Sequence, residues 1–182
     1  MQEVTSIDND ELSKEQIAQV VDLLSKLKPG FLPFDIFHQV ARLVAIPIIE
    51  LVPLRINPEG NVEILLLKRE ADDPVWPDRL HVPGTVIRAS DTSGSFDDPL
   101  SRISSQELMD SQISEPMFVR NILHHSDRGM EVSQVLWVEV QGETSVGEFY
   151  DVDHLPISLV QSQLDFIPDA VAHFKKIKLG KS

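Results

Sequence analysis

Apolar residues recur at helical spacing in two stretches near the N-terminus. Residues 13–16, Ser-Lys-Glu-Gln, have the form of a capping box, with Ser13 at the N-cap and Gln16 at N3. The stripe that follows consists of Ile17, Val20, Val21, Leu24 and Leu27. Gly30 then supplies a stop signal, so this pattern predicts a helix over residues 13–28.

A second helix is predicted just after Pro33. Its apolar stripe consists of Phe34, Phe37, Val40, Ala41 and Val44. Stripes of this kind usually pack against the core of their own domain. The two helices together carry more apolar surface than a compact domain needs, so we also expect part of it to be buried between the subunits of a homodimer.

From residue 46 onward the pattern is typical of buried strands and turns. The predicted elements are strands over 46–55, 62–69, 118–126 and 132–140, a helix over 98–113 that begins at Asp98-Pro99, and a helical tail over 157–177 with a boundary at Pro168. The chain therefore divides into a helical N-terminal extension, residues 1–45, and an α/β domain, residues 46–182.

Charge and cysteine content exclude several classes of function. The 182 residues include 29 acidic and 16 basic ones, for a net charge of −13, which argues against a general binder of nucleic-acid backbones. The absence of cysteine excludes disulfides, thiolate zinc sites and cysteine nucleophiles. No apolar run reaches the ~18 residues of a membrane span. No basic start followed by an apolar stretch is visible at Met1, so we expect a cytoplasmic protein that binds neither membrane nor nucleic acid.

The predicted helix over 98–113 carries the candidate chemistry. Glu107, Asp110 and Ser111 stand at i, i+3 and i+4, so a continuous helix would place them on one face. Acidic side chains on a helix are usually just solvated. These, however, follow two buried strands, a Pro83-Gly84 turn and a polar loop over 89–98, which is an arrangement with a familiar counterpart.

Segments 62–69, 80–87, 106–111 and 149–156 resemble the Nudix hydrolases, and the likeness extends over roughly residues 46–178. The resemblance implies an α+β fold in which a mixed sheet is sandwiched between helices. It also implies a pyrophosphohydrolase that cleaves a nucleotide or sugar diphosphate, a compound in which a nucleoside diphosphate is linked to another group. On this basis Mg²⁺ or Mn²⁺ would be held by the Gly84 carbonyl, Glu107, Asp110 and position 111, with Glu107 and Asp110 as the catalytic pair.

The sequence departs from the family pattern at several of these positions. Thr85 replaces a second glycine, Ser90 stands at the first glutamate, Gln106 replaces an arginine, and Ser111 replaces a metal-binding glutamate. The spacing from Gly84 to Glu107 is also longer than usual by about eight residues, which fits an insertion within 89–98. Two functions therefore stay open, which are a hydrolase with a weakly held metal and an inactive Nudix fold that binds a ligand or a protein.

Three further residues flank the predicted cleft. Arg69 and Arg88 have the geometry that suits phosphate, and His81 precedes the Pro-Gly turn. We expect all three to contact the substrate.

Overall fold

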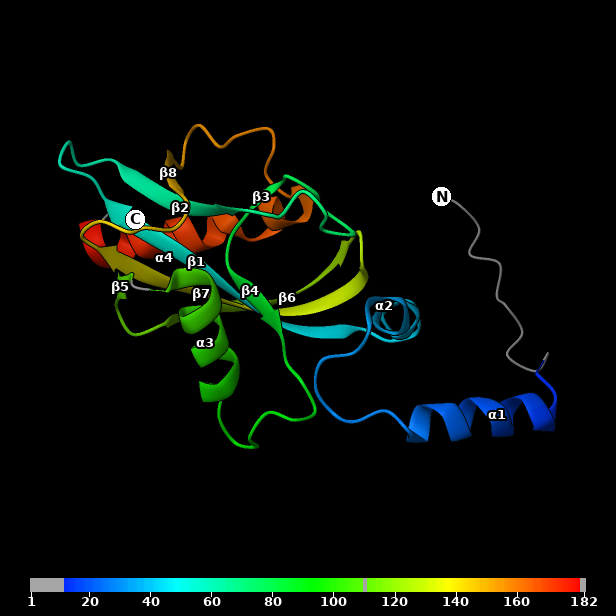
Figure 1. Ribbon diagram of the computed structural model, residues 1–182. Coiled ribbons are helices and arrows are strands. Elements are labelled where there is room, and N and C mark those ends of the chain that lie inside the picture. The colour runs from blue at the N-terminus through cyan, green and yellow to red at the C-terminus, as the bar shows by residue number, and fades with distance from the viewer. Residues whose placement is uncertain (1–11, 110, 181–182) are drawn as a thin grey trace.

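One mixed sheet forms the centre of the computed structural model, which describes residues 12–109 and 111–180 (Figure 1). Its strands are β1 (Ile46–Ile56), β2 (Val62–Lys68), β3 (Leu80–His81), β4 (Gly84–Val86), β5 (Gln112–Ile113), β6 (Met117–Ser126), β7 (Gly129–Gln141) and β8 (Glu148–Asp151). The sheet runs in the order β3-β2-β1-β7-β5, with β4 paired to β1, β6 to β7 and β8 to β2. The helices are α1 (Lys14–Ser25), α2 (Phe34–Leu43), α3 (Asp97–Ile103), α4 (Ile167–Leu179), the π-helical turn η2 (Ser104–Leu108) and the 3₁₀ turn η3 (Gln161–Asp165).

Strand β1 is the central strand of this sheet. It runs parallel to β7 and antiparallel to both β2 and β4. Residues on both of its faces are buried, from Ile48 through Leu54. A strand of this kind needs a layer on each side of the sheet.

The two layers correspond to two apolar clusters on opposite faces of the sheet. On one face, α4 and the residue before it contribute Phe166, Ile167, Ala170, Val171 and Phe174. On the other face, Ile103 of α3 and Leu108 of η2 pack against residues of β1, β2 and β7. These clusters confirm the prediction of a mixed sheet sandwiched between helices.

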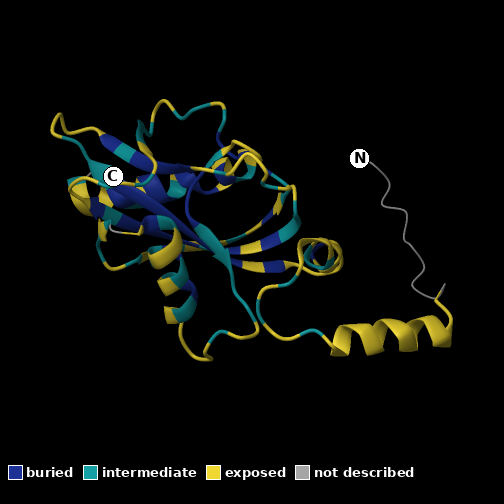
Figure 2. Ribbon diagram, in the orientation of Figure 1, coloured by how far each residue is buried: buried dark blue, intermediate teal, exposed yellow. Residues whose placement is uncertain are grey.

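The two N-terminal helices differ in what they contact. The capping box predicted at Ser13 is present, but α1 contains no buried residue and lies apart from the sheet (Figures 1 and 2). Helix α2 instead buries Ala41 against Ile46 and Ile48 at the start of β1. Helix α2 therefore packs in part on the core of its own domain, and α1 does not. None of the described helices is both long and apolar enough to cross a membrane.

The helix predicted over 98–113 is shorter than expected. Regular α-helix ends at Ile103, the π-helical turn ends at Leu108, and Met109 has a positive φ of 46° that cannot continue a helix. The Ser105 hydroxyl donates back to the Ser101 carbonyl at 2.7 Å, a bond that bends helices. The prediction is therefore wrong beyond Leu108, and residues 112–113 form β5 instead.

Candidate functional site

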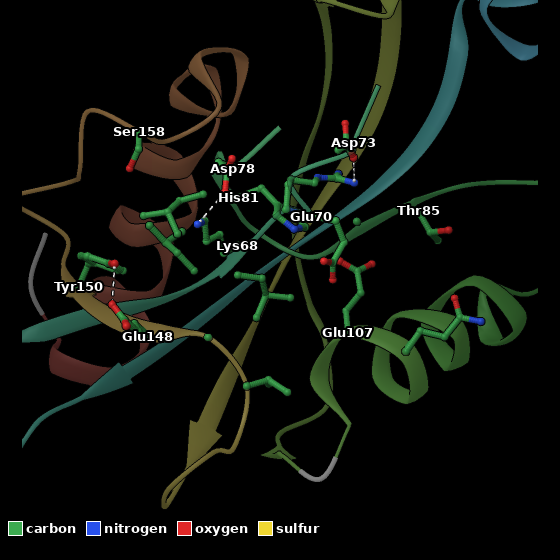
Figure 3. Close-up of a pocket in the computed structure, with 18 residues that line it drawn as sticks. Lys68, Glu70, Asp73, Asp78, His81, Thr85, Glu107, Glu148, Tyr150 and Ser158 are labelled. Atoms are coloured by element: carbon green, nitrogen blue, oxygen red, sulfur yellow. Dashed lines mark hydrogen bonds and ion pairs between the residues drawn. The ribbon is translucent and has the colours of Figure 1, made fainter. Parts of the chain in front are cut away.

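A polar cavity of about 910 Å³ opens between the ends of β2, β3, β4 and β8 and the turn η2 (Figure 3). Its polar lining consists of Lys68, Arg69, Glu70, Asp73, Asp78, His81, Thr85, Gln106, Glu107, Glu148, Tyr150 and Ser158, together with Gly84. Ligand pockets in proteins usually measure roughly 300–1,000 Å³. The cavity is therefore large enough for a nucleotide.

Gly84 lies at the wall of this cavity between two carboxylates. Its backbone N–H favours the charged form of the nearby Glu107 of η2. A Cβ atom at this position would lie 2.7 Å from Glu50 Oε2 and 3.1 Å from the Ile49 carbonyl oxygen. Only glycine allows this close approach.

The inserted loop is attached to the same part of the structure. Asp91 accepts from both terminal nitrogens of Arg102 on α3, at 2.5 and 3.0 Å. The Arg102 guanidinium also donates to the Val86 carbonyl at 3.0 Å. One arginine thus fixes the loop and α3 against β4, next to Gly84.

The two carboxylates beside Gly84 hold their protons unusually tightly. Burial raises the pKa of Glu107 to about 7, although Arg69 and the Gly84 N–H act in the opposite direction. Burial also raises the pKa of Glu50 to about 8, against the attraction of Arg128. Both groups are therefore substantially protonated near neutral pH.

His81 is a neutral side chain in the wall of the cavity. Burial and the nearby Arg69 lower its pKa to about 3. Its Nδ1 lies 2.8 Å from the Val82 carbonyl oxygen, so Nδ1 carries the proton and donates it. Nε2 is consequently an acceptor, suited to a ligand hydroxyl or amide and unsuited to a phosphate.

The cations of the cavity come from the end of β2. Lys68 forms an exposed ion pair with Asp78 at 2.7 Å. Arg69 contacts Asp73 at 3.3 Å, and its Nε is buried without a partner among the described residues. The Arg69 guanidinium also lies 5.4 Å from the ring centroid of Trp76.

Trp76 itself is buried against the chain's own side chains. The guanidinium of Arg128 lies 4.7 Å from its ring centroid, and its Nε1 donates to Asp127 at 2.5 Å. The indole therefore belongs to the packed wall and is not a free stacking surface.

Of the three predicted substrate contacts, the structure brings two together. Arg69 and His81 both line the polar cavity. Arg88 lines a separate apolar cavity, where its guanidinium lies 5.7 Å from the ring centroid of Phe31.

The predicted metal-binding set is divided by the early end of the helix. Glu107 lines the cavity, but the Ser111 hydroxyl oxygen lies 2.6 Å from that of Thr144. Asp110 falls outside the described residues. Within the described part of the chain, no three histidine, aspartate or glutamate side chains lie close enough to hold an ion. Of the expected ligands, the described residues place Glu107 and Gly84 at the cavity.

Sequence reasoning missed several polar residues of the cavity. Glu70 directly follows the predicted strand 62–69, and Figure 3 shows it projecting toward the same part of the cavity as Glu107. Its position at a strand end was a usable signal. Glu148 and Tyr150 reach the cavity from β8, which pairs with β2, and no motif indicated them. Glu50 lies beside Gly84 and does not line this cavity; it interrupts an apolar strand, and that interruption marked it as unusual.

The sheet, its two helical layers and the turn at Gly84 together define a Nudix fold. A mutT/nudix family protein from Listeria innocua matches with a TM-score of 0.55 and 16% identity, over 75% of this chain and 98% of that one. The NUDIX domain of Shewanella oneidensis NrtR, solved in complex with ADP ribose, matches with a TM-score of 0.52 and 14% identity, over 85% and 97%. The C-terminal domain of mouse MUTYH, solved in complex with human PCNA, matches with a TM-score of 0.56 and 11% identity, over 72% and 90%.

At these identities the likeness establishes the fold alone. No protein-family model and no curated protein matches the sequence. The fold expected from the sequence resemblance is confirmed.

The raised pKa of Glu50 predicts that stability falls as pH rises from 6.5 to 8.5. In the folded chain Glu50 keeps its proton up to its pKa of about 8, whereas in the unfolded chain it has already lost the proton above its ordinary pKa of 4.5. His81 is mostly neutral in both states above 6.5, so it contributes little. Between pH 6.5 and 8.5 we expect the melting temperature of the parent protein to fall by roughly 4–8 °C more than that of Glu50→Gln, as measured by thermal melts.

Glu59→Gln, in the exposed turn after β1, is the matched control and should follow the parent protein. Parallel curves for Glu50→Gln and the parent would show that Glu50 is ionised in the folded state.

Proposed function

We propose that this chain binds a nucleoside diphosphate-linked compound in the polar cavity, and that binding is its main function. The observation that carries this proposal is the end of the helix at Leu108. It leaves Ser111 bonded to Thr144 and outside the lining of the cavity, while Lys68, Arg69 and Glu107 line a nucleotide-sized cavity.

The lining of the cavity suits the two parts of such a compound. Lys68 and Arg69 offer N–H donors to phosphate oxygens. The carboxylates of Glu70, Asp78 and Glu148 offer acceptors to sugar hydroxyls. The NUDIX domain of NrtR, which has a similar fold, was solved in complex with ADP ribose. This supports a nucleotide sugar as the first ligand to test.

A second candidate function is hydrolysis of the same compound with Mg²⁺ or Mn²⁺. It is favoured by the presence of Glu107 and Glu70 in one cavity. Magnesium is often bound through one or two carboxylates together with substrate phosphates. Glu107, Glu70 and Asp110 are the side chains that would hold the ion, and the bound ion would polarise the phosphoryl oxygens. Water would be the nucleophile.

We further propose that the chain forms a homodimer through α1. Ile17, Val20 and Leu24 are each close to half exposed, and in the described part of the chain no residue of the helix is buried. A solitary helix of 12 residues is marginal in water, so an apolar partner surface would stabilise it.

Binding should depend on Lys68. We expect Lys68→Ala to weaken ADP-ribose binding about 10-fold in isothermal calorimetry without metal, because a charge-assisted hydrogen bond to phosphate is lost. Lys175→Ala is the matched control, since Lys175 forms an ion pair with Asp153 and does not line the cavity. Equal losses in both variants would indicate nonspecific attraction. No binding by the parent protein would refute the proposed function.

Turnover separates the two candidate functions. With Mn²⁺ and ADP-ribose we expect no release of AMP above the rate of the uncatalysed control. We also expect no gain in Ser111→Glu, because the Ser111 hydroxyl contacts Thr144 and Ser111 does not line the cavity. AMP release by the parent protein that is abolished in both Glu107→Gln and Glu70→Gln would establish the hydrolase instead.

The dimer is tested by light scattering at micromolar concentration. We expect a dimeric mass for the parent protein and a monomeric mass for Val20→Glu, because a buried carboxylate would oppose association. Gln19→Glu places the same charge at a neighbouring polar position and should leave the dimer intact. A monomeric parent protein would contradict this prediction.

A further inference from the structure

A second cavity of about 620 Å³ lies beside the polar one. We call it the apolar groove; the segment 27–32, α2 and β4 form its walls. Its apolar lining includes Phe31, Phe34, Phe37, Val40, Val86 and Ile87. Phe31 and Val40 are substantially exposed, so the groove is accessible from solvent.

The apolar groove and the polar cavity adjoin one another. Arg69, Asp73, Gly84 and Thr85 line both of them. Arg69 is therefore a cation at the junction, with a buried Nε that has no partner among the described residues. A phosphate bound beside Arg69 would place its ester group next to the apolar groove.

Several polar groups of the groove already have partners within the chain. The backbone N–H groups of Val75 and Trp76 both donate to the Asp73 carboxylate. Arg128 already forms an ion pair with Glu131 at 2.8 Å. A sugar in this groove would bury hydroxyls against a mostly apolar lining, which is costly, whereas a hydrocarbon group would bury none.

We propose that the ligand is a nucleoside diphosphate esterified to a hydrophobic group, with the diphosphate beside Arg69 and the hydrophobic group in the apolar groove. This inference rests on the proposed function and specifies the group attached to the diphosphate. Continuity of the two cavities at Arg69 and Thr85 is the observation that selects this occupant.

A series of ADP esters tests the inference by calorimetry. Affinity is measured for ADP, ADP-ribose and the ethyl, butyl and hexyl esters of ADP. Each methylene that leaves water contributes a factor of about four in affinity. We expect the hexyl ester to bind at least roughly 50-fold more tightly than the ethyl ester, and more tightly than ADP-ribose.

Two variants locate the effect in the apolar groove. Val40→Glu should lower the affinity for the hexyl ester to that for ADP, and it should leave the affinity for ADP unchanged. Leu43→Glu is the matched control on α2, because Leu43 is exposed and does not line the groove. Phe31→Ser, in the segment before α2, provides a second groove variant should Val40→Glu fail to fold.

The outcomes separate this inference from the proposed function. Absence of binding by ADP and all its derivatives refutes the proposed function. Binding of ADP and ADP-ribose with no gain along the ester series refutes only the inference about the hydrophobic group. A gain that is unchanged in both Val40→Glu and Phe31→Ser also refutes it. If α1 of a second copy covers the groove, affinity will not rise along the ester series until that dimer dissociates. This result would also overturn the inference.

Discussion

The close packing at Gly84 is the constraint on which the arrangement of the cavity depends. Its lack of a side chain lets Glu50 of β1 approach closely, and its N–H favours the charged form of Glu107 of η2. Three elements that are distant in sequence therefore meet at one residue. Because this packing shields both carboxylates from water, their pKa values are raised and they keep their protons, so the packing of the backbone also sets the charge of the site.

Much of the fold could be predicted because long apolar runs require burial on both faces. The runs from Ile46 and Val62 predicted two central strands, and they occur as β1 and β2. Pro168 was predicted as a boundary and lies in the first turn of α4. The capping box at Ser13 was likewise found where its local hydrogen bonds predict it. In each case the signal is local to the element that it specifies.

The candidate site was less predictable because its parts depend on contacts between distant residues. Spacing alone placed Glu107 and Ser111 on one helical face, but pairing of β5 with β7 competes for the segment after Leu108. Arg88 was expected at the cleft, yet its position after β4 directs it to the α2 side. The likeness to Nudix proteins was sufficient to predict where the cavity lies and insufficient to predict which charges line it.

The position of Trp76 has a practical consequence for observing this molecule. Its indole contacts both Arg69 and Arg128, lines the apolar groove, and is almost completely buried. The chain has two tryptophans, and the other, Trp137, lies in the core against Phe174 under α4. Fluorescence from Trp76 therefore reports on movement of Arg69 and Arg128, while Trp137 supplies a constant background. Replacing Trp137 with phenylalanine would leave a single built-in optical probe at the junction.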